Sequence, residues 1–285
     1  MAERQTPTVR HRRLSAELRQ LREAAGLDTL ETAQRMGWDR SKVNRIERSQ
    51  WKRLKEADIR GLCALYGVAD EGRVDALVSM AKQAKETGWW VRYSDVLGPG
   101  SYVSLEAQAS ELRFYGGMLI PGLLQTASYC KALARAAGIT NDNEIKRRAE
   151  ARLARQEILE RTAPPTVSAV VDEAALRKLV GSKLTMREQF LRLMLLNEQQ
   201  MAEIRVLTDE MGAHCAMGGP FALLDFPHDD QSSVVYLDIS RDGIFLEEQD
   251  DIRTYRAQFD SLSAMALSPE ASNAHLARMV DELAE

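Results

Sequence analysis

A short run near the N-terminus carries side chains suited to binding a nucleic acid. Arg40, Ser41, Lys42, Asn44 and Arg45 lie within six residues of one another. An arginine can bind guanine O6 and N7 with two hydrogen bonds, and serine and asparagine also bond base edges in the major groove. A lysine is a point charge and suits a phosphate oxygen. The run predicts base contacts from most of these side chains and a phosphate contact from Lys42.

Such side chains need a helix end that presents them outward, and the neighbouring residues predict one. Asp39 is a good N-cap for a helix over residues 40–48, and Val43 and Ile46 supply its apolar side. Gly37 separates this helix from a shorter one before it, which is the helix-turn-helix pattern. The first turn of such a recognition helix enters the major groove.

Apolar residues recur at helical spacing through the first 86 residues and then change pattern. Beyond residue 90, Pro and Gly punctuate alternating strand and helix segments, so we expect an α+β fold with a largely antiparallel sheet. With 285 residues, about two domains are expected. The predicted organisation is a flexible arm over 1–11, a five-helix DNA-binding domain over 12–86 and an effector or dimerisation domain over 90–285. The five helices are expected at 11–25, 30–36, 40–48, 55–66 and 71–85. In the second domain, the expected elements include helices at 123–137 and 144–161, the latter rich in arginine, and strands at 166–172 and 203–207.

The net charge of −4 hides an uneven distribution of charge along the chain. Residues 1–60 have a balance of +6, residues 61–219 are neutral, and residues 220–285 have a balance of −10. A basic N-terminal part on an acidic body indicates an anionic partner at the N-terminus only.

The composition excludes several classes of protein. Hydrophobic residues make up 45% of the chain, so it can bury a core, and no apolar run approaches the roughly 20 residues that span a membrane. The N-terminus has no apolar segment typical of a secretion signal. The three cysteines lie far apart and indicate a reduced compartment. We expect a cytoplasmic, nucleoid-associated protein without a membrane partner.

The chain resembles two known groups of regulators. Its first part resembles the Xre-type, lambda-repressor-like helix-turn-helix proteins, in the form found in many actinomycete regulators. Its second part is similar to the effector domain of WhiJ-like regulators, some of which are described as antitoxin-like. The matching segments are LREAAGL at 21–27, GW at 37–38, SKVNRIE at 41–47, LEAQA at 105–109, LIPGLLQTASY at 119–129 and ALSPEAS at 266–272.

The resemblance implies roles for individual residues of the first domain. Arg40, Ser41 and Arg45 match base-reading positions, while Thr29 and Lys42 match positions that contact phosphates. A pair formed by Arg22 and Glu47 matches an ion pair that bridges two helices and supports the recognition helix. Among the basic residues that follow, Lys52 lies where backbone contacts are expected.

This sequence departs from the usual pattern at four positions. Thr29 replaces a usual Gln, Thr32 replaces a buried aliphatic residue, Leu30 occupies a usually polar position, and Ser49 replaces a Gly. The second helix could therefore be rotated or less well packed.

An enzyme is the competing class, and the sequence favours it less than a regulator. The four histidines match no metal-ligand spacing, so neither a metal nor a cofactor is expected. His214 and Cys215 are adjacent, and we interpret them as a buried cysteine beside an exposed histidine rather than a catalytic pair.

The sequence thus predicts a sequence-specific regulator that binds double-stranded DNA. One recognition helix reads only a few base pairs, so we expect a homodimer on two half-sites. The second domain is expected to modulate activity through a small companion protein or a ligand. The alternative is an antitoxin-like protein that sequesters a small polypeptide and binds DNA for autoregulation.

Overall fold

The computed structural model describes residues 9–51, 54–83, 89–97, 101–227, 233–239 and 243–283. The chain divides into two compact units. The first takes in the chain up to Val91 and a short stretch that ends at Ser104, and the second takes in Arg92–Gly98 and the chain from Leu105 onward. No helix among the described residues is both long and apolar enough to cross a membrane.

The first unit is helical, as the sequence predicts. Glycines in the left-handed conformation, which carries no steric penalty for glycine, end three of the predicted segments: φ is 67° at Gly26, 65° at Gly37 and 75° at Gly67. The helices are α1 (Val9–Ala24), α2 (Thr29–Met36), α3 (Arg40–Glu47), α4 (Glu56–Leu65) and α5 (Glu71–Gln83).

One hydrophobic core joins the helices of this unit. Leu14 and Leu18 of α1 pack with Ile46 of α3, together with apolar side chains of α4 and α5. The buried Trp51 indole donates a hydrogen bond of 3.0 Å to the Ser15 hydroxyl, so its one polar group is satisfied inside the core. This core fixes the orientation of α3.

Short helices that the sequence analysis did not predict follow α5. They are a 3₁₀ helix (Trp89–Tyr93), α6 (Ser94–Leu97) and α7 (Ser101–Glu106). Each has at most six residues, which is too short for an apolar periodicity to be detected.

The second unit is built on a six-stranded sheet of order β3-β2-β1-β4-β5-β6. The pairs β1–β4, β4–β5 and β5–β6 are antiparallel, so the predicted α+β class with a largely antiparallel sheet is confirmed. The pairs β1–β2 and β2–β3 are parallel, which was not predicted. The strands are β1 (Glu111–Gly116), β2 (Thr166–Asp172), β3 (Glu203–Leu207), β4 (Phe221–Asp225), β5 (Val234–Asp238) and β6 (Gly243–Leu246).

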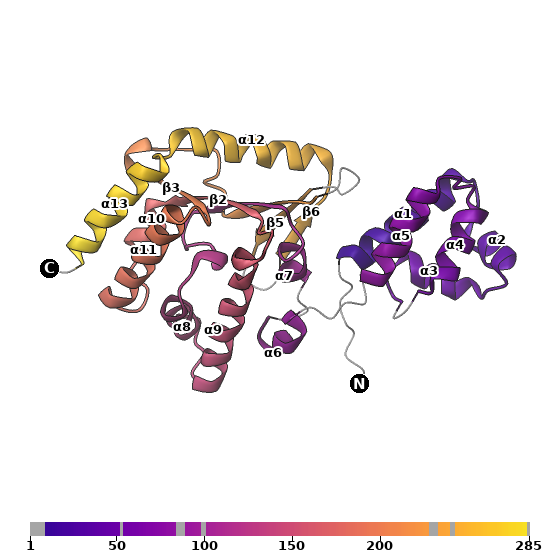
Figure 1. The fold of residues 1–285 in the computed structure, drawn as a ribbon, viewed down its shortest axis with the longest axis horizontal. Helices are drawn as coiled ribbons and strands as arrows, with labels where there is room; N and C mark the ends of the chain where they lie inside the picture. The colour runs from indigo at the N-terminus through magenta and orange to yellow at the C-terminus, as the bar shows by residue number, and fades with distance from the viewer. Residues whose placement is uncertain are drawn as a thin grey trace. The chain divides into compact units, whose positions relative to one another are not determined.

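Helices supply the connections that parallel strands require. The chain passes from β1 to β2 through α8 (Ala127–Ala136) and α9 (Asp142–Gln156), and from β2 to β3 through α10 (Glu173–Arg177) and α11 (Lys183–Glu198). In Figure 1, α12 lies along one side of the sheet, while α8, α9 and α11 lie on the other. The remaining elements are 3₁₀ helices at Gly122–Leu124, Glu157–Glu160 and Asp209–Met211, then α12 (Gln249–Met265) and α13 (Pro269–Glu282).

Candidate nucleic-acid interface

Two side-chain caps set the geometry of the helix-turn-helix. The Asp28 carboxylate accepts hydrogen bonds from the Leu30 and Glu31 amides at 2.6 and 2.8 Å, and Glu31 accepts in return from the Asp28 amide at 3.0 Å. The Asp39 carboxylate accepts from the Ser41 amide at 2.7 Å. Such caps satisfy amides that have no partner within the helix, so the starts of α2 and α3 are both fixed.

The recognition helix α3 has one buried and one exposed side. Val43 and Ile46 are buried, whereas Arg40, Ser41 and Arg45 are exposed. Asn44 is partly buried. The structure thus brings the predicted base-reading side chains to one solvent-facing surface at the start and middle of α3.

Two of these side chains already have hydrogen bonds that orient them. Arg40 Nε donates to Thr29 Oγ1 at 3.2 Å, which leaves the two Nη groups of the arginine at the outer end of the side chain. Hydrogen bonds from the Ser41 side chain and then its amide lower the pKa of Asp39. The Ser41 hydroxyl therefore uses its hydrogen on Asp39, and its oxygen is left as an acceptor.

Lys42 lies against the protein rather than fully in solvent. Its ammonium is 3.1 Å from Asp58 Oδ1 of α4 and 3.5 Å from the centroid of the Trp38 ring. A cation over an indole face and beside a carboxylate is held by both attractions. The predicted phosphate contact of Lys42 would have to compete with these partners.

Arg22 of α1 is bonded to Glu47 at the end of α3. Its Nε donates to Glu47 Oε1 at 2.6 Å and its Nη2 to Oε2 at 2.9 Å, while Nη1 donates to the Leu27 carbonyl at 2.8 Å. The two side chains are only 10% and 9% exposed. Hydrogen bonding to Glu47 raises the pKa of Arg22. A two-point contact of this kind resists rotation of α3 about its axis.

The unusual residues of α2 do not rotate the helix. Thr32 is fully buried, as the aliphatic residue that it replaces would be, and its hydroxyl donates to the Asp28 carbonyl at 2.9 Å. Leu30 remains 45% exposed, on the usually polar side. The register of α2 is therefore kept, because threonine satisfies its own hydroxyl inside the helix.

Ser49, which replaces the usual glycine, adopts the left-handed conformation with φ of 57°. The Gln50 amide bonds the Arg45 carbonyl at 2.7 Å and the Ser49 amide bonds the Ile46 carbonyl at 3.1 Å, so α3 ends in a Schellman motif. The backbone geometry of the usual glycine is present here without glycine.

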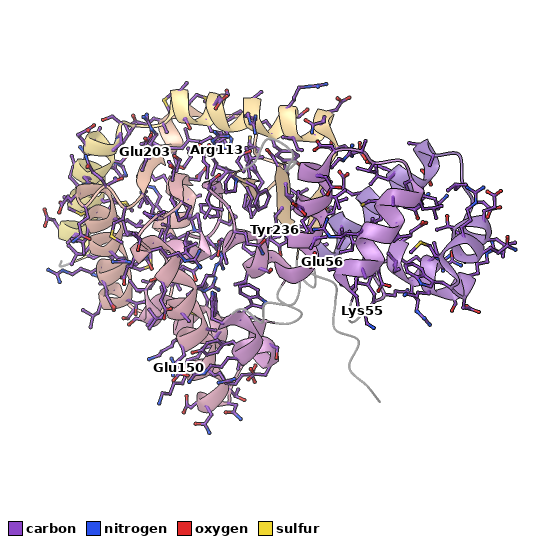
Figure 2. The ribbon with its side chains drawn as sticks, turned by 45° about the vertical axis from the view of Figure 1, so that its right-hand side comes forward. Lys55, Glu56, Arg113, Glu150, Glu203 and Tyr236 are labelled. Atoms are coloured by element: carbon purple, nitrogen blue, oxygen red, sulfur yellow. The ribbon has the colours of Figure 1, made fainter. Side chains whose placement is uncertain are left out.

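The structure describes some, but not all, of the basic residues that follow α3. Arg48 and Lys55 are exposed, and Lys55, which Figure 2 labels, is the residue before α4 in the chain. The predicted contact residue Lys52 lies outside the described residues.

The predicted burial of His214 and Cys215 in the second unit was wrong, because the structure reverses it. The His214 side chain is 8% exposed and its Nε2 lies 3.3 Å from both Asp172 Oδ2 and the Tyr115 hydroxyl, whereas Cys215 is exposed. The Ala216 amide donates to His214 Nδ1 at 3.3 Å, so Nε2 is left to donate. His214 therefore connects the loop after β3 to the sheet. Burial of the Tyr115 side chain, together with the nearby Asp172 carboxylate, raises the pKa of Tyr115.

A second group of charged residues, on α9, was not predicted from the sequence. Arg148, Arg152 and Arg155 lie on one side of that helix and line a cavity in the second unit. The one signal available was the density of arginine in the segment predicted as a helix at 144–161.

Comparison with known families defines the class and then the family. Residues 13–77 match the family described as a helix-turn-helix domain, a DNA-binding and non-enzymatic kind of domain. Residues 100–278, more than half of the chain, match the family described as a domain of unknown function (DUF5753), and the chain belongs to this family. Neither the curated proteins nor the solved structures gave a match.

Proposed function

We propose that the protein is a sequence-specific regulator of transcription that acts on double-stranded DNA in the cytoplasm, at the nucleoid. The observation that carries this proposal is the exposed group of Arg40, Ser41 and Arg45 on a helix held by the Arg22–Glu47 pair. An anchored helix with free hydrogen-bonding groups on its outer side is what reading of base edges requires.

From the internal hydrogen bonds of these side chains we infer which base groups they would read. Arg40 keeps both Nη groups for guanine O6 and N7, since only its Nε is bonded to Thr29. Ser41 offers an acceptor oxygen, which suits the amino group of adenine or cytosine. Asn44 and Arg45 lie further along α3 and supply the remaining base contacts.

Phosphate contacts are proposed for Thr29, Lys42 and Lys52. The Thr29 oxygen accepts from Arg40, so the hydroxyl hydrogen can be donated to a phosphate oxygen. These contacts set position on the duplex and carry no sequence information directly.

Selection of binding sites from random duplexes, followed by titration of the selected site, tests the proposal. Replacing Arg40 with alanine is expected to cost about 1–3 kcal/mol for that site and to relax the preference at one base pair. Arg35→Ala is the matched control, since Arg35 is an exposed arginine of α2 outside the α3 surface. If Arg40→Ala kept full affinity and preference while folding normally, this docking of α3 would be wrong.

We further propose that the regulator is a homodimer that pairs through α11. Leu184, Leu191 and Leu195 are 71%, 41% and 40% exposed on this helix, and they lie along one side of it. An antiparallel pairing of two copies places Glu188 of each opposite Arg192 of the other, which adds charge complementarity.

Sedimentation is expected to show a dimer that Leu191→Glu dissociates. Leu153→Glu, at an exposed leucine of α9, should not dissociate it; a monomer at high concentration, free and on DNA, would contradict the idea.

The second unit is proposed to be a WhiJ-like effector domain that modulates DNA binding through a companion protein or a ligand. The acidic residues of 220–285 would suit a basic companion. The alternative is an antitoxin-like protein that sequesters this companion and uses DNA binding for autoregulation. Titration of the selected site with and without the purified companion separates the two, since equal DNA affinity would argue against modulation by this partner.

A further inference from the structure

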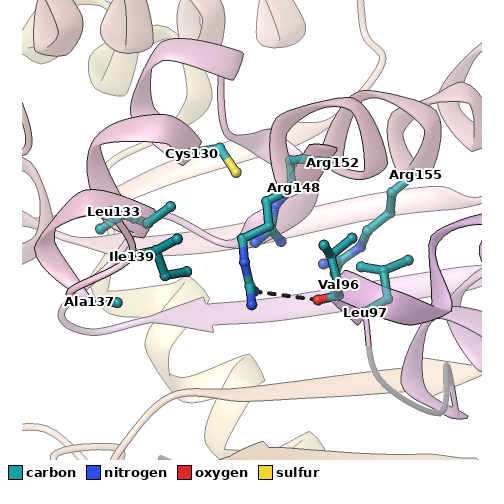
Figure 3. A pocket seen from close by; sticks show the side chains of 10 residues that line it. Val96, Leu97, Cys130, Leu133, Ala137, Ile139, Arg148, Arg152 and Arg155 are labelled. Atoms are coloured by element: carbon teal, nitrogen blue, oxygen red, sulfur yellow. Dashed lines mark hydrogen bonds between the residues drawn. The ribbon is translucent and has the colours of Figure 1, made fainter. Parts of the chain in front are cut away.

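The second unit contains a cavity of about 200 Å³ with a largely apolar wall. Val96 and Leu97 of α6, Leu133 and Ala134 of α8, and Ile139 contribute apolar side chains to it. Figure 3 shows Leu133 and Ile139 on one side, Val96 and Leu97 on the other, and Arg148 between them. An engineered apolar cavity of about 150 Å³ holds benzene, so this volume suits a molecule with about six to nine non-hydrogen atoms.

Two of the three arginines that line the cavity have carboxylate partners. Arg148 donates from Nε and Nη2 to Glu144 Oε1 at 3.1 and 3.0 Å, and its Nη1 lies 3.4 Å from the Val96 carbonyl. Arg155 Nη2 donates to Glu106 Oε1 at 2.5 Å, and its Nε bonds the other oxygen of the same carboxylate. These two guanidinium groups are neutralised within the protein.

Arg152, between them on α9, has no such partner among the residues that the structure describes. No described carboxylate lies within 4.0 Å of its guanidinium, and the Cys130 thiol is its hydrogen-bonding neighbour. Asp238 of β5 is influenced by the charges of Arg152 and Arg155 but forms no ion pair with either. Burial, followed by repulsion from Arg155, lowers the pKa of Arg152, while the Cys130 thiol and the Glu106 carboxylate act in the opposite direction.

Gly122 shows that this arrangement is built into the chain. A Cβ atom at Gly122 would lie 2.1 Å from Arg152 Nη1 and 2.8 Å from Arg155 Nη1. The glycine of the segment LIPGLLQTASY thus provides the space in which the two guanidinium groups lie. A cation kept in such a place without an ion-pair partner among the described residues is costly to folding, which indicates that it serves a ligand.

We propose that the cavity binds a small monocarboxylate with an apolar body, whose carboxylate pairs with Arg152. Guanidinium groups form strong two-point hydrogen bonds with carboxylates, and the apolar wall would enclose the rest of the molecule. One unpaired guanidinium neutralises one negative charge, so a monocarboxylate fits better than a phosphate, which also lacks an apolar body.

Calorimetric titration of the full chain with benzoate and hexanoate tests this proposal directly, and it does not depend on DNA binding. Both carboxylates are expected to bind. Benzamide, hexanamide and inorganic phosphate are expected to bind at least tenfold more weakly, because they lack the charge or the apolar body. Equal binding of the amides, equal binding of phosphate, or no binding of either carboxylate would overturn the proposal.

Variants separate a binding role of Arg152 from a structural one. Arg152→Met should weaken carboxylate binding tenfold or more yet raise the melting temperature of the ligand-free protein, since it removes a partly buried charge that has no described ion-pair partner. A structural role predicts a lower melting temperature. Ala134→Leu should block both carboxylates by filling the cavity, whereas Arg187→Met, at an exposed arginine of α11, should change nothing. Unchanged binding in Arg152→Met or in Ala134→Leu would contradict the site.

Discussion

The ammonium group of Lys42 has three candidate partners, and one substitution separates them. Lys42→Met keeps an unbranched chain over Trp38 but removes the charge beside Asp58. If the ammonium moves to a phosphate on DNA, this variant should lower the slope of log affinity against log salt by about 0.9 and weaken binding to all duplexes alike. Loss of the partly exposed ion pair should cost the free protein at most about 1 kcal/mol.

The salt dependence of binding, measured between low and moderate salt with the selected site and with random duplex, provides this measurement. Arg35→Met is a control for loss of one exposed charge on α2. An unchanged slope for Lys42→Met, accompanied by lower stability, would mean that Lys42 only ties α3 to α4.

Ser49 holds a conformation that costs other residues more than glycine. The left-handed region is disfavoured by roughly 1–2 kcal/mol for residues with a Cβ atom. A change to glycine recovers only part of this energy, because glycine also gives the unfolded chain more conformational freedom. Ser49→Gly is therefore expected to stabilise the first unit by about 0.5–1 kcal/mol, measured by urea unfolding of the full chain. Gly26→Ser, the opposite change at another left-handed position, should lower the free energy of unfolding by a similar amount, because φ is 67° there and no atom lies within 4 Å of a new Cβ. Equal stability of Ser49→Gly and the wild type would show that no conformational cost is present.

At the scale of the elements, a buried ion pair ties α9 to α7 and contributes to the stability of the second unit. Arg155 and Glu106 are 9% and 1% exposed at their side chains, and the guanidinium binds both carboxylate oxygens. Arg155→Met removes this charge from a buried carboxylate and is expected to cost about 3–5 kcal/mol, measured by denaturant unfolding. The double variant with Glu106→Gln should recover much of the loss. A loss below about 1 kcal/mol in the single variant would show that the pair contributes little.

Helix and strand positions could be predicted well where the local pattern was strong. The strands at 166–172 and 203–207 were predicted at their observed bounds, since each is a short apolar run bounded by turn residues. The helix expected over 123–137 begins instead at Ala127, because Thr126 caps it and its hydroxyl accepts from the Tyr129 amide at 3.2 Å. A cap of this kind was present in the sequence but lay inside an apolar run that suggested a longer helix.

The pairing of the strands could not be predicted in the same way. Strand order depends on contacts between distant residues, such as Phe114 beside Ala169 on one side and Ala222 on the other. The alternation of strands and helices from 111 to 207 was the available signal for parallel pairing. The candidate DNA-contact residues came from a local motif, whereas the pairing of Arg155 with Glu106, 49 positions apart, needed the fold.

At the scale of the whole molecule, the cavity lies next to the segment that follows the first unit along the chain. Val96 and Leu97 of α6 line it, and α6 begins three residues after Val91, the last residue of the first unit before it. Arginines of α9 hold this segment: Arg147 bonds Asp95, and Arg148 lies within hydrogen-bonding distance of the Val96 carbonyl. Binding of a carboxylate at Arg152 would therefore act on the same helix that anchors the start of the second unit.

A ligand changes DNA affinity only if it binds two states of the protein differently, and the effect must then be reciprocal. We predict that saturating benzoate changes the affinity of the full chain for its selected DNA site by about fivefold or more, and that this DNA changes benzoate affinity by the same factor. Titrations of each ligand in the presence and absence of the other measure both factors. Arg152→Met should bind the DNA with one affinity whether or not benzoate is present, because its response requires the carboxylate contact. Equal DNA affinity of the wild type with and without bound benzoate would show that the cavity is not coupled to DNA binding. A companion protein would then be the remaining candidate for the control of DNA affinity.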